Sequence, residues 1–174
     1  MSITNNMIVL FLIAGLYALT WFLPIFNEGT TTGYEGAVFA IETLKDGFAH
    51  VTGHPGARAD TMSEALLEII AGLCNILFIG AVTLAYNKPA WSYIISPLIV
   101  VSMLVWFSFE DLGIGYYLWL LSGVFLFLYC LHSVCCSREL SLSGVLAGKW
   151  ALPIYVPVLF TGALYLTHFV HEGA

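Results

Sequence analysis

The chain ends with three side chains that can hold a metal ion or carry protons. His168 and His171 are three residues apart, and Glu172 follows directly. On an α-helix, residues three and four apart lie on the same side. This spacing is compatible with Zn²⁺ or Cu²⁺ if other segments supply a third or fourth ligand. The alternative is a hydrated helix end. The sequence contains no tight metal-binding motif such as H-E-x-x-H, which favours this alternative.

A second polar group interrupts the apolar stretch "SEALLEIIAGLCN". If 63–86 is one helix, Glu64, Glu68 and Asn75 share a face. Glu64 follows Thr61 at capping-box spacing, which favours a structural role. An ionised Glu68 facing lipid is costly, so we expect it to face the bundle, water or a partner, as a proton or ion group or in a structural hydrogen bond. Asn75 is typical of interhelical hydrogen bonds and is the weaker binding candidate.

The stretch "GYEGAVFAIETLKDGFAHV" predicts an amphipathic helix in the segment 27–62. Its apolar residues recur at spacings of three and four on one face: Ala37, Ile41, Leu44, Phe48 and Val51. Such a helix lies along the membrane surface or caps the bundle, with this face against lipid or other helices. Asp46 and His50 lie on another face and are further candidates for proton or ion binding.

Composition places the protein in a membrane. Only 9% of the residues are charged, 15% are aromatic and the mean hydropathy is +0.91, far from the values of soluble domains. We predict a single all-α membrane domain over 1–174, a bundle of about five transmembrane helices with the amphipathic helix between the first and second. About 20 apolar residues cross a bilayer, and the stretches that qualify are 7–26, 63–86, 90–109, 112–134 and 146–170.

The few basic residues predict the orientation. Short-loop Lys and Arg favour the cytoplasmic side. With five spans, one side carries Lys88, Arg138 and Lys149, and the other carries Lys45 and Arg58. We therefore expect a bacterial inner-membrane protein with a cytoplasmic N-terminus, and with the C-terminus and 27–62 outside. Five basic residues spread over two faces do not capture nucleic acid.

The positions of the histidines argue against a haem. His132 lies near the inner end of its predicted span and His168 near the opposite surface, so they do not form an axial pair at one depth. Four of the five histidines and ten of the eleven acids fall on the outer side. The sequence thus predicts an acidic, histidine-bearing outer face.

The shortage of convergent catalytic groups favours a non-catalytic subunit over an enzyme. Small-residue helix faces and aromatic-rich spans predict packing against lipid and against other membrane chains, either copies of itself or a larger inner-membrane complex. The alternative is an outward-facing proton, cation or metal site that uses Glu68 and the outer histidines, in transport or membrane-bound catalysis.

The predicted topology can be tested by labelling. In a cysteine-free background, single cysteines at positions 57 and 87 are expected to react oppositely with a membrane-impermeant thiol reagent, because the two positions lie on opposite sides. Mass shift on a gel measures the reaction. Equal labelling at both positions would contradict five spans.

Overall fold

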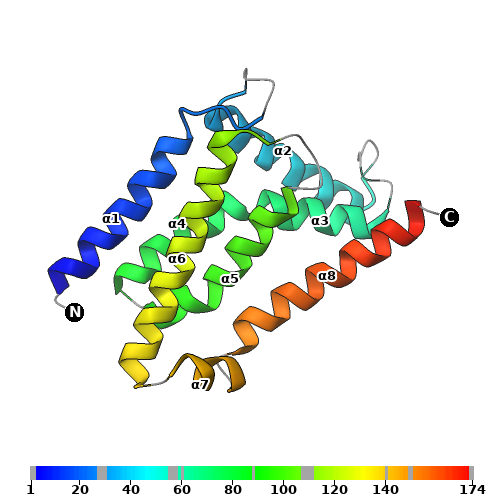
Figure 1. The fold of residues 1–174 in the computed structure, drawn as a ribbon. Helices are drawn as coiled ribbons and strands as arrows, with labels where there is room; N and C mark the ends of the chain where they lie inside the picture. The colour runs from blue at the N-terminus through cyan, green and yellow to red at the C-terminus, as the bar shows by residue number, and fades with distance from the viewer. Residues whose placement is uncertain are drawn as a thin grey trace.

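The protein is all-α in a computed structural model that describes residues 3–26, 31–54, 59, 61–87, 89–106, 112–139, 141–148 and 151–172. This part of the chain forms eight helices (Figure 1). Their bounds are α1 Ile3–Thr20, α2 Gly33–Val51, α3 Met62–Gly72, α4 Cys74–Asn87, α5 Pro89–Val105, α6 Ile114–Arg138, α7 Leu142–Ala147 and α8 Leu152–Glu172. The predicted helical class is confirmed.

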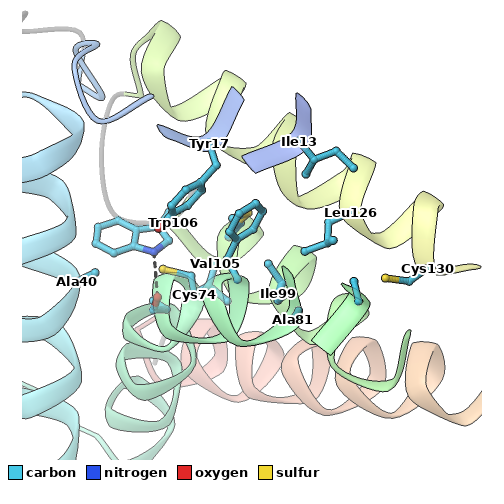
Figure 2. Packing of buried hydrophobic residues seen from close by; sticks show 14 of the residues in the cluster. Ile13, Tyr17, Ala40, Cys74, Ala81, Ile99, Val105, Trp106, Leu126 and Cys130 are labelled. Atoms are coloured by element: carbon cyan, nitrogen blue, oxygen red, sulfur yellow. Dashed lines mark hydrogen bonds between the residues drawn. The ribbon is translucent and has the colours of Figure 1, made fainter. Parts of the chain in front are cut away.

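Helix α5 is the centre of the bundle, in contact with α3, α4, α6 and α8. Helix α1 packs on α6, and α8 packs on α5 and α3, so α1 and α8 flank the bundle on opposite sides (Figure 1). Helix α2 lies along α3 at one end. The core therefore lies between α4, α5 and α6, with α1 beside it (Figure 2).

One helix of the described chain, α6, is long and apolar enough to cross a membrane. Helices α3 and α4 together form a second candidate, bent by 41° at their junction. Shorter apolar stretches lie at 7–20, 90–105 and 152–167. The structure therefore does not show the five spans that the sequence predicts.

Several predicted boundaries are wrong. The stretch 63–86 is not one helix, because α3 ends at Gly72 and α4 begins at Cys74. The stretch 146–170 contains the end of α7 and most of α8, with a break between Ala147 and Leu152. Helix α1 ends at Thr20 and a turn follows it. Pro24 and Phe26 then form isolated β-bridges with Thr32 and Leu112. Hydropathy alone does not register such breaks, because the residues around them are equally apolar.

The break between α3 and α4 is stabilised by a tryptophan. In an uninterrupted helix, the Ala71 carbonyl would accept a hydrogen bond from the residue four positions later. Here it accepts one from the indole N–H of Trp106, at 3.2 Å (Figure 2). A buried carbonyl near a helix end needs such a partner. Trp106 thus stabilises the bend.

A serine plays the same role inside α5. Pro97 has no N–H, so the Tyr93 carbonyl four residues earlier loses its helical donor. The hydroxyl of Ser96 donates to that carbonyl at 3.2 Å, and Ser96 is fully buried. Helix α5 consequently continues through the proline to Val105.

Two tyrosines bind the carbonyls of the last turn of α5. The Tyr116 hydroxyl, from α6, donates to the Met103 carbonyl at 2.5 Å, and the Tyr165 hydroxyl, from α8, donates to the Val105 carbonyl at 2.9 Å. The last carbonyls of a helix have no partner within it. These bonds therefore join α6 and α8 to the end of α5.

Helix α2 approaches α3 through small residues. A Cβ atom at Gly47 would lie 2.6 Å from the Ala65 carbonyl oxygen, and one at Gly72 would lie 2.6 Å from that of Ala40. The predicted apolar face of α2 is instead largely open, with Ile41 and Phe48 exposed. The helix is confirmed, but its contact with the bundle uses a different face.

Ser96→Ala is expected to lower the free energy of unfolding by about 1–3 kcal/mol, because the Tyr93 carbonyl would lose the hydroxyl that replaces its helical donor. The matched control is Ser102→Ala. Ser102 is equally buried and donates to the Ile99 carbonyl, but Met103 retains its N–H for that carbonyl, so we expect a smaller loss. Unfolding in mild detergent measures both, and equal losses would contradict the role of Ser96.

Candidate functional site

The backbone at the predicted metal group near the C-terminus is helical. Helix α8 continues to Glu172, so the helical spacing of His168 and His171 is present. The side chains of these three residues lie outside the described part. No three His, Cys, Asp or Glu side chains are grouped for a metal within the described residues. A Zn²⁺ or Cu²⁺ site there stays a prediction.

Two other candidates from the predicted outer face lie on α2, one turn apart. Asp46 and His50 are half-buried. His54, just beyond the helix, is exposed and has its Nδ1 3.0 Å from the hydroxyl of Thr52. Their proposed role in proton or ion binding stays a prediction.

The polar stripe predicted for residues 64–75 is divided by the helix break. Glu64 and Glu68 belong to α3 and Asn75 to α4, which is bent away by 41°. The N–H of Glu64 donates to the Thr61 hydroxyl at 3.1 Å, so the predicted cap is present. Glu68 is half-buried with a buried Oε2 atom. The single stripe is wrong, because its geometry assumed an unbroken helix.

Asn75 joins two helices and also lines a cavity. Its Oδ1 accepts a hydrogen bond from the Tyr17 hydroxyl of α1 at 2.8 Å. The Tyr17 ring stacks on Phe78 of α4, with centroids 4.1 Å apart. This is the interhelical contact that the sequence favoured. The cavity beside it was not predicted.

We call this cavity the aromatic pocket. Its volume is about 30 Å³, and it lies where α1 ends and α2 and α6 begin. The described lining consists of Thr20, Trp21, Ile25, Phe26, Gly33, Gly36, Ala37, Asn75, Trp106, Leu112, Tyr116 and Trp119. None of these described residues is charged. The described lining is therefore mainly aromatic and apolar.

One wall of the pocket is an extended segment after α1. The N–H of Gly113 donates to the Ile25 carbonyl at 2.6 Å, and that of Gly115 donates to the Pro24 carbonyl at 2.8 Å. A Cβ at Gly115 would lie 2.6 Å from the same Pro24 oxygen. Glycine therefore lets the start of α6 approach this segment closely enough to enclose the pocket.

The other walls are aromatic rings fixed edge to face. Trp106 and Trp119 have centroids 6.3 Å apart at 74°, and Trp119 and Tyr116 lie 5.7 Å apart at 66°. Phe39 packs on the far side of this cluster, 5.6 Å from Trp106. Such pairs stabilise beyond the burial of area. These ring contacts stabilise the walls of the pocket.

The C-terminal end of α6 carries a separate polar pair. His132 and Cys136 are exposed, with Nε2 and Sγ 3.5 Å apart. They supply two possible ligands rather than three. The exclusion of a bis-histidine haem stays a prediction, since the His168 side chain is not described.

Comparison with protein families, curated proteins and solved structures finds no match to this chain.

The link between Tyr17 and Asn75 can be measured with a double-mutant cycle. Tyr17→Phe, Asn75→Ala and the double variant are expected to show a coupling energy of about 0.5–1.5 kcal/mol, the net value of one hydrogen bond. Unfolding in mild detergent gives the energies. Tyr129→Phe with Asn75→Ala is the control pair, since no hydrogen bond joins them. Additive effects for Tyr17 and Asn75 would contradict the link.

Proposed function

We propose that this protein is a non-catalytic, multi-pass subunit of a bacterial inner membrane that packs through α8 against another membrane chain or a second copy of itself. The observation that carries the proposal is the exposure of α8. Its large apolar side chains are exposed along most of its length: Leu152, Tyr155, Val156, Val158, Leu159, Phe160 and Leu166.

The wider surface supports a lipid environment. Phe11 and Leu12 on α1 are about 70% exposed, as are Leu159 and Leu166 on α8. Soluble monomers rarely expose contiguous apolar patches larger than a few hundred Å². Lipid tails or neighbouring helices cover such a surface without cost. A bilayer therefore accounts for both flanks of the bundle.

Helix lengths support five crossings. At a rise of 1.5 Å per residue, the 21 residues of α8 extend about 31 Å and the 18 of α1 about 27 Å. Helix α5 is shorter, at 17 residues, within the range that spans a hydrocarbon core of about 30 Å. The proposed spans are α1, the bent pair α3 and α4, α5, α6 and α8, with the N-terminus cytoplasmic.

Small residues on the exposed side of α8 leave space for another helix. Thr161 is buried, and Leu164 and Tyr165 pack against the core cluster. Gly162 and Ala163 are exposed, and no described atom lies within 4 Å of a Cβ placed on Gly162. Small residues let membrane helices approach closely. Within the described residues, no other helix approaches Gly162 closely, which supports a partner there.

Photo-crosslinking in native membranes tests the proposal. A benzophenone amino acid at Leu159 is expected to form a protein adduct, and one at Phe11 is expected to form none. Both positions are 71% exposed, so the pair controls for exposure. Adding Gly162→Leu is expected to reduce the Leu159 adduct at least several-fold, because the added side chain occupies the open space at Gly162. Mass spectrometry identifies the adduct. No protein adduct at Leu159, or the same adduct at both positions, would contradict the proposal.

A further inference from the structure

We propose that the aromatic pocket binds a small ammonium group, such as a primary or monomethylated amine. This inference concerns the end of the bundle formed by α1, α2 and α6, and it does not depend on the packing of α8. It rests on the size of the pocket, on its described polar atoms and on its rings.

The size of the pocket limits its ligand. A single water needs about 10–15 Å³ measured in this way, so a volume of about 30 Å³ accepts two or three non-hydrogen atoms. Pockets for drug-sized molecules and cofactors are at least about tenfold larger. A quinone ring, a sugar or a haem does not fit. A free methylamine fits, as does the end of a longer amine that enters from the opening.

The polar side chains of the wall are mostly engaged with the backbone. The Thr20 hydroxyl donates to the Tyr17 carbonyl at 2.6 Å, Trp106 donates to Ala71 and Tyr116 donates to Met103. An ordered water needs two to four polar partners. Asn75 is the remaining amide in the described lining, and its Oδ1 has a second lone pair beside the bond from Tyr17. The wall therefore favours a ligand that donates a few hydrogen bonds and otherwise contacts rings.

Aromatic rings provide that contact for a cation. Trp21, Trp106 and Trp119 line the pocket together with Tyr116. Tryptophan is the strongest cation–π partner among the side chains, and the interaction strengthens where water is excluded. No lysine or arginine occurs in the described lining. The whole chain carries a net charge of −6, which attracts cations.

The same ammonium chemistry has two sources at a membrane surface. One is a free small amine, and the other is the ethanolamine headgroup of a phospholipid. A choline headgroup carries three methyl groups on its nitrogen and exceeds the volume of the pocket. Phosphatidylcholine nanodiscs therefore provide a lipid background that does not compete.

Binding of radiolabelled methylammonium to the full chain in phosphatidylcholine nanodiscs tests the proposal. We expect saturable binding that unlabelled methylammonium displaces and that equal concentrations of tetramethylammonium or methanol do not. Trp119→Leu is expected to weaken binding at least fivefold, and Trp119→Phe to weaken it less, because phenylalanine keeps a smaller ring. Trp91→Leu is the matched control, since Trp91 is exposed on α5 and absent from the described lining. Size-exclusion chromatography and thermal unfolding check the fold of each variant.

The proposal would be overturned by no saturable binding to the wild-type protein, or by equal binding to the wild type and a folded Trp119 variant. Displacement by methanol or tetramethylammonium would also overturn it, because neither shares both the charge and the size. Nanodiscs that contain phosphatidylethanolamine then identify the source. Weaker methylammonium binding in them assigns the site to the lipid headgroup, and unchanged binding assigns it to free amines.

Discussion

Backbone carbonyls that lose their helical donor inside an apolar bundle must find another, because an unpaired buried carbonyl costs about 1–3 kcal/mol. This chain meets the demand at four places with side chains: Ser96 for Tyr93, Trp106 for Ala71, Tyr116 for Met103 and Tyr165 for Val105. Three of these four bonds join different helices. The same groups that satisfy the backbone therefore fix the arrangement of α3, α5, α6 and α8.

The aromatic pocket follows from this constraint. Trp106 and Tyr116 point their polar atoms at carbonyls of α3 and α5, and both residues line the pocket. The indole N–H of Trp106 and the hydroxyl of Tyr116 already donate to these carbonyls. Both residues therefore present mainly ring surface to the pocket. The residues that stabilise the helix ends therefore also make the aromatic pocket suited to ligands that interact with aromatic rings.

Local patterns predicted the local structure, and their limits are visible in particular residues. The helical class, the amphipathic helix over Gly33–Val51 and the cap at Thr61 depend on neighbours in sequence, and all three are present. At the break at Leu73, the Ala71 carbonyl accepts a bond from Trp106, which is 33 positions from Leu73, so a local sequence pattern does not reveal this contact. The pocket combines Trp21, Asn75 and Trp119 from three distant segments. Asn75 was a candidate because it is polar, whereas the tryptophans were indistinguishable from ordinary apolar residues of a helix.

The glycines fall into two groups, those packed closely against another helix and those beside open space. At Gly47 and Gly72, an added Cβ would meet the backbone of the facing helix, so close packing inside the bundle requires these residues. At Gly15, Gly80 and Gly162 no described atom lies within 4 Å of such a Cβ. Glycine in a helix interior costs up to about 1 kcal/mol relative to alanine, which needs a compensating contact. For α8, whose large apolar side chains are exposed beside Gly162, the proposed partner helix would supply that contact.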